Sequence, residues 1–282
     1  MIRVSELFKA VQGEGLYAGT PSVFLRTFGC NFRCPGFSVP SDQWTRDKTG
    51  RVENQEVLPL LAKAKEFKSL QELPILQTGC DTYAAVYPRF KHLTKDYAID
   101  DLVDEIVRVN GGKFSENVHL VITGGEPLLG WQPKLALVLD RLYCDFGLRH
   151  VTFETNGTQL LERDIADLPY GLKVSFSISA KLACSGESKE DRFNKDSIIS
   201  MMCKGDSWFK FVVGKEEDIT EIKEYLQVCS PVPDPVVYLM PLGGHPTEYQ
   251  KHEELVFDLA LKYNYRFSPR LHVAIKGNGW GQ

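Results

Sequence analysis

Residues 117–127 read NVHLVITGGEP, and this stretch decides the fold prediction. Its apolar, β-branched run stops abruptly at Thr123, which predicts a buried strand that ends in an open turn. Gly124 and Gly125 have no Cβ, so a ligand can lie against the backbone there. Glu126 adds a carboxylate that can accept hydrogen bonds from an ammonium or hydroxyl group. The segment is therefore either a ligand-binding strand end or an ordinary strand with a tight turn.

Strand-like and helix-like patterns alternate along most of the chain. The sequence predicts strands at 22–29, 118–123, 150–155, 172–178, 208–213 and 236–240. It predicts helices from residue 99 to the Gly111-Gly112 pair and at about 133–144, 194–203, 217–228 and 251–263. This alternation is typical of an α/β fold with a parallel sheet and right-handed crossovers. Six strands are too few to close an eight-stranded barrel, so we expect a partial (βα)6, open TIM-like barrel with its reactive loops at the carboxyl ends of the strands.

Composition excludes several classes of protein. The 282 residues are 43% hydrophobic, enough for one large domain, and the net charge of -4 gives no basic field for nucleic acid or an anionic membrane surface. No apolar run approaches the roughly 18 residues of a membrane span, and the first residues do not resemble a signal peptide. Seven cysteines, an odd number, argue against a disulfide framework. We therefore expect a cytoplasmic protein with reduced thiols and neither nucleic acid nor membrane as partner.

Cys30 and Cys34 follow the first predicted parallel strand, where reactive loops are expected. A compact loop of the form Cys-x3-Cys-x2-Cys would have its third cysteine at position 37, which is Phe37. We interpret residues 35–79 as an insertion and Cys80 as the displaced third ligand, because the entropy of loop closure grows only logarithmically with length. A helical pattern is expected at 57–67 inside it. The insertion is either a solvated surface elaboration or a surface for a protein partner.

Three thiolates limit the chemistry of this loop. Thiolates bind zinc or iron–sulfur clusters, but a structural zinc site normally has four protein ligands. The four remaining cysteines lie in or beside helical or strand patterns and are expected to be buried, inert thiols: Cys144, Cys184, Cys203 and Cys229. Three ligands on a four-iron cluster leave one iron open to a small chelating ligand.

These motifs resemble the radical S-adenosylmethionine (SAM) enzymes, in which the open iron binds SAM and an electron cleaves it to methionine and a 5′-deoxyadenosyl radical. The resemblance implies a [4Fe-4S] cluster on Cys30, Cys34 and Cys80 within a single radical SAM domain over 1–282. It implies that Gly124, Gly125 and Glu126 hold the methionine part of SAM. Further SAM contacts would come from two segments: Ser179, Ala180 and Lys181, and Met240, Pro241, Leu242 and Gly243.

Within that superfamily the chain is most similar to the 7-carboxy-7-deazaguanine synthases of queuosine and deazapurine synthesis. The matching segments are 8–15, 24–26, 80–82, 123–127, 154–157 and 268–272. The resemblance implies ring contraction of 6-carboxy-5,6,7,8-tetrahydropterin with loss of ammonia, a carbon–nitrogen lyase reaction. Val11, Gln12, Gly13 and Thr123 would contact the pterin and Arg26 its carboxylate, with Thr82 as a ligand of Mg²⁺. An electron donor such as flavodoxin and a homodimer are also implied.

Arg26 has a second interpretation. It is a lone charge in the middle of a core strand, and such a charge needs a partner. That partner is either an anion in a pocket or an acidic side chain of the protein itself.

Two other functions remain open from the sequence. Another radical SAM activity, such as a glycyl-radical-enzyme activase, would keep the cysteines and the Gly-Gly-Glu-Pro segment but has no need of residues 12–15, Arg26 and Thr82 together. A noncatalytic interaction protein would keep the scaffold and use the insertion to bind another protein. The segment 277–282 could fold over the active site in any of these cases.

Overall fold

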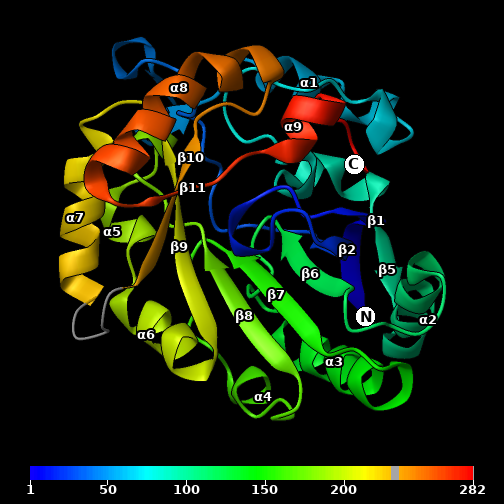
Figure 1. The fold of residues 1–282 in the computed structure, drawn as a ribbon. Helices are drawn as coiled ribbons and strands as arrows, with labels where there is room; N and C mark the ends of the chain where they lie inside the picture. Colours follow the sequence, from blue (N-terminus) through cyan, green and yellow to red (C-terminus); the bar gives the residue numbers. More distant parts are fainter. Residues whose placement is uncertain (230–234, 282) are drawn as a thin grey trace.

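A nine-stranded, mostly parallel sheet forms the centre of the computed structural model, which describes residues 1–229 and 235–281 (Figure 1). The strand order is β11-β10-β9-β8-β7-β6-β2-β1-β5. All pairs from β2 to β11 are parallel, whereas β1 pairs antiparallel with both β2 and β5. The bounds are β1 Ile2–Val11, β2 Pro21–Thr27, β5 Lys95–Tyr97, β6 His119–Gly124, β7 His150–Thr155, β8 Lys173–Ile178, β9 Asp206–Val213, β10 Val236–Pro241 and β11 Arg266–Phe267.

The prediction of an open parallel barrel is confirmed. The six predicted strands correspond to β2, β6, β7, β8, β9 and β10, and they are consecutive in the sheet. The order begins at β11 and ends at β5, so these two strands are edges and the sheet is not closed. Strands β1, β5 and β11 were not predicted. They extend the parallel sheet at both sides.

Helices cover the outer face of the sheet, as Figure 1 shows for α2, α3, α4, α6 and α7. Leu120 and Ile122 of β6 belong to the main hydrophobic core, and residues of these helices, such as Leu139 of α3, belong to it too. The alternation along β6 leaves Thr123 on the opposite, inner face. The helix bounds are α2 Ile99–Asn110, α3 Gln132–Phe146, α4 Arg163–Ala166, α5 Lys189–Arg192, α6 Lys195–Lys204, α7 Asp218–Cys229, α8 Pro246–Tyr263 and α9 Leu271–Lys276.

The expected helix positions are largely confirmed. The Gly111-Gly112 pair ends α2 as expected, since Gly111 is the C-cap with φ +87°. Helix α8 begins five residues before the predicted start because Pro246 occupies its first turn and the His245 side chain accepts a hydrogen bond from the Thr247 N–H. The connection between β7 and β8 holds only the short helix α4.

The insertion packs into a second, smaller hydrophobic core. Its elements are the hairpin β3 Thr45–Arg46 and β4 Val52–Glu53, the helix α1 Leu58–Ala62 and short 3₁₀ turns, so the helix expected at 57–67 is wrong beyond Ala62. A second hydrophobic cluster unites it with residues after Cys80: Val57, Ala64, Leu70, Leu73, Leu76, Tyr83, Ala84 and Phe90. In Figure 1 α1 and α9 both lie at the upper edge of the view.

None of the helices in 1–229 and 235–281 has the length and apolar character needed to span a bilayer.

Candidate active site

A cavity of about 240 Å³ opens at the carboxyl ends of the parallel strands. All three candidate cluster ligands, Cys30, Cys34 and Cys80, line it, and so does Thr82. The predicted substrate and SAM residues that share this cavity are Val11, Gln12, Gly13, Arg26, Thr123, Gly124, Gly125, Ser179, Lys181, Met240, Pro241, Leu242 and Gly243. The structure thus brings together segments that are up to about 230 positions apart in the sequence, as expected at the rim of a parallel barrel.

Two predicted SAM residues do not line the cavity. Ala180 is buried. Glu126 has no exposed surface, and its carboxylate accepts hydrogen bonds from the Thr155 hydroxyl (2.8 Å) and from the backbone N–H groups of Asn156 (2.7 Å) and Leu128 (3.1 Å). Burial raises the pKa of this carboxyl, against the effect of these hydrogen bonds. The Glu126 side chain therefore ties the end of β6 to the end of β7.

Gly124 and Gly125 line the cavity, and their lack of a Cβ permits close packing within the protein itself. A Cβ on Gly125 would lie 2.4 Å from the Gly29 carbonyl oxygen and 2.7 Å from Cys30 Cβ. A Cβ on Gly124 would lie 2.5 Å from Thr27 Oγ1. The end of β6 is thus pressed against the loop that carries the first cysteine.

The three cysteines suit a cluster better than a single metal ion. All three are free thiols, and burial raises the pKa of each, for Cys30 to about 12. The positive charge of Lys181 acts in the opposite direction on all three. Within 1–229 and 235–281 no three His, Cys, Asp or Glu side chains converge closely enough to hold one ion. A four-iron cluster is larger than one ion, so its thiolate ligands need not meet at a point.

Arg26 pairs with an acidic side chain and also lies at a pocket, so both possibilities that the sequence left open apply to it. Its Nε donates to Glu6 Oε2 at 2.7 Å, and both side chains are largely buried. Burial lowers the pKa of the guanidinium, but the attraction of Glu6 outweighs this and raises it. Arg26 also lines the cavity. It therefore has an internal partner and still presents its fork to a ligand.

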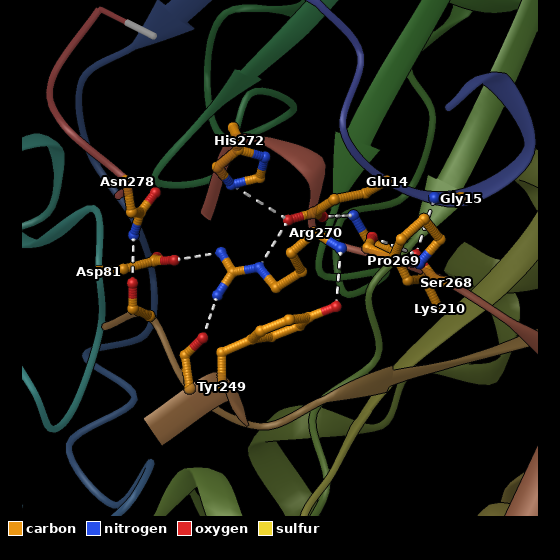
Figure 2. A network of polar contacts seen from close by, with 12 residues as sticks. Glu14, Gly15, Asp81, Lys210, Tyr249, Ser268, Pro269, Arg270, His272 and Asn278 are labelled. Atoms are coloured by element: carbon orange, nitrogen blue, oxygen red, sulfur yellow. Dashed lines mark hydrogen bonds and ion pairs between the residues drawn. The ribbon is translucent and has the colours of Figure 1, made fainter. Parts of the chain in front are cut away.

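Arg270 lies at the centre of a buried network that closes one side of the cavity (Figure 2). Its Nε donates to Glu14 at 2.9 Å, one terminal nitrogen to Asp81 at 2.6 Å, and the other to the Gly243 carbonyl at 2.6 Å. Lys210 donates to the other oxygen of Glu14. His272 lies with Nε2 3.6 Å from Glu14.

The charges in this network stabilise one another. Burial alone would raise the pKa of Glu14, but the attraction of Lys210 and Arg270 holds it far below its ordinary range. Burial would lower the pKa of Lys210 and of Arg270, yet their carboxylate partners raise both. For His272 burial dominates and lowers the pKa. The cavity therefore presents ionised carboxylates beside a neutral imidazole.

Curated relatives match this sequence along nearly its full length. A 7-carboxy-7-deazaguanine synthase from Halobacterium salinarum is 31% identical over 292 aligned positions, which cover 96% of this chain and 89% of the relative. One from Hyperthermus butylicus is 30% identical and covers 98% of this chain and 93% of the relative. The chain belongs to the 7-carboxy-7-deazaguanine synthase family.

The fold agrees with that family. The crystal structure of QueE from Escherichia coli superposes with a TM-score of 0.54 at 19% identity, covering 95% of this chain and 92% of the other. A scan against protein-family models found no match. The radical SAM resemblance seen in the sequence is thus supported by whole-chain relatives.

Several charged residues at the candidate site of this family member were not predicted from the sequence. Glu14, Asp81, Glu154, Lys210 and Arg270 all line the cavity. A signal for Lys210 was present, because it is a lone charge in the apolar strand FKFVV, just as Arg26 is in VFLRT. The same argument about an expensive buried charge applies to both strands.

The prediction for the four other cysteines was only partly right. Cys229 is buried and Cys184 is partly buried, but Cys144 and Cys203 are exposed. Both exposed thiols lie near the C-terminal ends of amphipathic helices, α3 and α6, on the face turned away from the sheet. Neither lines the cavity.

Proposed function

We propose that this protein is a radical SAM enzyme that converts 6-carboxy-5,6,7,8-tetrahydropterin to 7-carboxy-7-deazaguanine with release of ammonia. Membership of the 7-carboxy-7-deazaguanine synthase family carries the proposal. The shared cavity supports it, because three free cysteines and the predicted substrate residues face the same small space. We treat the chain as one functional domain in which residues 35–79 elaborate the cluster loop.

Cys30, Cys34 and Cys80 would hold a [4Fe-4S] cluster, which supplies the electron that cleaves SAM when both are bound. The backbone at Gly124 and Gly125, which lines the cavity, would contact the methionine part of SAM. Ser179, Lys181 and residues 240–243 would complete the SAM side of the cavity.

A second set of residues that line the cavity suits a carboxylated pterin. The Arg26 guanidinium can bind a carboxylate with two parallel hydrogen bonds. The ionised carboxylate of Glu14 and the side chain of Glu154, which accepts from Gln12 Nε2 at 3.1 Å, can accept from the amino and ring N–H groups of the pterin. The residues thus complement both ends of the substrate, and they orient it and exclude water.

Thr82 is our proposed protein ligand for Mg²⁺. It lines the cavity beside Cys80, with Oγ1 3.4 Å from the Cys80 sulfur. Magnesium usually keeps several waters and takes few protein oxygens, so one hydroxyl together with substrate oxygens is a suitable set. A one-electron donor such as flavodoxin, a homodimer and a cytoplasmic location complete the proposal. Free thiols throughout the chain agree with a reducing compartment.

The test is anaerobic reconstitution with iron and sulfide, then incubation with SAM, reductant, Mg²⁺ and 6-carboxytetrahydropterin. Mass spectrometry follows 5′-deoxyadenosine and 7-carboxy-7-deazaguanine. We expect both products from the wild type and from Cys203→Ala, whose thiol is exposed on α6, and neither from Cys80→Ala. Cleavage of SAM without the deazaguanine would refute the substrate. A loaded cluster that yields neither product would favour a noncatalytic interaction protein.

A further inference from the structure

The cluster loop holds one of its cysteines in a costly conformation. Cys34 is buried and has φ +46°, in the left-handed region that a residue with a Cβ rarely adopts. Such a conformation persists only where the surroundings fix it. A residue outside the loop makes hydrogen bonds to the backbone at this position.

Glu187 accepts two consecutive backbone N–H groups of this loop. Its Oε1 is 2.7 Å from the Arg33 nitrogen and 2.7 Å from the Cys34 nitrogen. Hydrogen bonds to an ionised acceptor are stronger than those between neutral groups. Glu187 borders a second, larger cavity of about 1340 Å³ and does not line the cysteine cavity. It therefore contacts the cluster loop from outside the cysteine cavity.

The segment that carries Glu187 is packed rigidly against the loop. The Gly36 N–H donates to the Ser185 carbonyl at 2.9 Å, and the buried Ser185 hydroxyl donates to the Leu182 carbonyl at 2.7 Å. A Cβ on Gly36 would lie 2.8 Å from the Gly186 nitrogen. The backbone at 185–186 therefore packs directly against the cysteine loop, and Glu187 follows at once in the chain.

We infer that Glu187 is a positioning residue for the cluster ligands: it fixes the backbone of Cys34 and places a negative charge beside that ligand. The inference rests on the proposed function only in assuming that Cys34 binds the cluster. The charge has a consequence of its own. A carboxylate beside the cluster loop disfavours further negative charge there, so it makes a bound cluster harder to reduce.

Two substitutions distinguish the effect of Glu187 on the position of the loop from the effect of its charge. Glu187→Ala removes both acceptor and charge, and loss of such outer-shell partners typically weakens metal binding about 10- to 100-fold. We expect this variant to lose iron to a chelator at least about tenfold faster than wild type. Glu187→Gln keeps one acceptor oxygen and loses the charge. It should retain iron nearly as wild type does but have a higher reduction potential, measured by anaerobic titration with electron paramagnetic resonance.

Glu190→Gln is the matched control, because this exposed acid lies three residues further along and has no role in the loop. It should match the wild type in both measurements. Amide hydrogen exchange on the iron-free protein gives a further readout, with faster exchange at Arg33 and Cys34 expected in Glu187→Ala alone. If Glu187→Ala keeps wild-type iron retention and exchange, Glu187 does not position the loop. If Glu187→Gln has the wild-type potential, its charge has no effect on the cluster.

These outcomes are separate from a failure of the proposed function. Iron retention, potential and exchange need no pterin, so a wrong substrate would leave them unchanged. A wild-type chain that takes up no iron would refute the cluster itself, and the exchange measurement would still decide whether Glu187 fixes the loop.

Discussion

Arg26 shows how one side chain can satisfy both a structural and a functional demand. Glu6 on the neighbouring strand β1 engages only Nε, which leaves the terminal nitrogens for a ligand in the cavity. A guanidinium can divide its donors in this way because they lie in a fixed fork, whereas an ammonium is a point charge.

Arg26→Lys should therefore impair substrate binding more than folding. The lysine keeps a positive charge opposite Glu6 but cannot offer two parallel donors to a carboxylate. Hydrogen bonds to charged groups contribute about 1.5–3 kcal/mol, so we expect KM for the carboxypterin to rise roughly tenfold or more. Arg3→Lys, at the exposed pair with Asp96, is the control. An unchanged KM would mean that Arg26 serves only Glu6.

Gly125 is a second residue whose identity the cavity requires. Gly125→Ala would force a methyl group against the Gly29 carbonyl and Cys30. Overpacking of this kind costs about 1–3 kcal/mol, and it should displace the first cysteine and lower the iron bound per chain after reconstitution. Gly130→Ala provides the comparison: it has φ +73° but open space, so it should lose about 1–2 kcal/mol of stability and keep its iron. Equal iron content in both variants would contradict this account.

At the scale of elements, the insertion and the segment 277–281 support each other. Trp280 packs in the second hydrophobic cluster, its Nε1 donates to the Leu73 carbonyl at 3.1 Å, and its ring meets Tyr83 edge-on at 5.6 Å. The neighbouring Asn278 donates to the Gly244 carbonyl at 2.7 Å. Residues 278–281 line the cysteine cavity, so the described part of this segment lies at the candidate site, and Gln282 lies outside the described residues.

Trp280→Ala should open this wall of the cavity. Truncating a fully buried aromatic side chain lowers the free energy of unfolding by about 3–5 kcal/mol. Because Trp280 is only partly buried, we expect a loss of about 3 kcal/mol or less. The segment should become sensitive to limited proteolysis, and more 5′-deoxyadenosine should form per molecule of product because water can enter. Trp280→Phe keeps the ring contact and should behave nearly as wild type. Proteolysis and coupling unchanged in Trp280→Ala would show that the anchor is dispensable.

The strand patterns predicted the parallel strands because their apolar residues are either consecutive, as in β6 (HLVITG), or alternate with polar ones, as in β8 (KVSFSI). They did not predict β1, although Ile2 and Val4 are buried at alternate positions, as strand residues are. The helix expected at 57–67 fails because the small cluster of the insertion can bury Val57, Ala64 and Leu70 without a continuous helix. Tertiary packing decided that segment, and a local pattern could not reveal it.

At the scale of the whole molecule, histidines at the amino ends of the strands make stability depend on pH. His119 is buried, stacks on His150 at 4.6 Å between ring centroids and meets Tyr17 edge-on at 4.5 Å. Burial, together with His150 and Lys173, lowers its pKa to about 4. Because the unfolded chain binds the proton more readily, this contribution to stability is complete above about pH 6.5 and is lost as the pH falls toward 4.

His119→Phe should remove part of that dependence. Phenylalanine keeps an aromatic ring beside His150 and does not titrate, so the urea midpoint of the iron-free protein should fall less between pH 6.5 and 4 than in the wild type. His92→Phe changes an exposed histidine in the 3₁₀ turn before β5 and is the control. Parallel curves for wild type and His119→Phe would refute the assignment.

The sequence predicted which segments meet at the rim, because the carboxyl ends of parallel strands lie at one edge. It could not predict the pairing of Arg270 with Glu14 and Asp81, which depends on the path of the chain after β11. Nor could it show that the Glu126 carboxylate is buried against Thr155 and does not line the cavity, since a side chain at a strand end can point in either direction. The candidate cluster ligands could be predicted from residue types, whereas the charge network around Arg270 could be seen only in the folded structure.

The Arg270 network also sets an order of events during synthesis. Arg270 lies 256 positions after Glu14 and 189 positions after Asp81, so a ribosome has released all three cysteines long before it adds this residue. Until then Glu14 and Asp81 lack their common partner, and the wall that Arg270 and Trp280 complete is missing. The nascent chain therefore carries all three cysteines well before it carries the residues that complete the cavity wall, and that wall can form only after Arg270 and Trp280 have been synthesised.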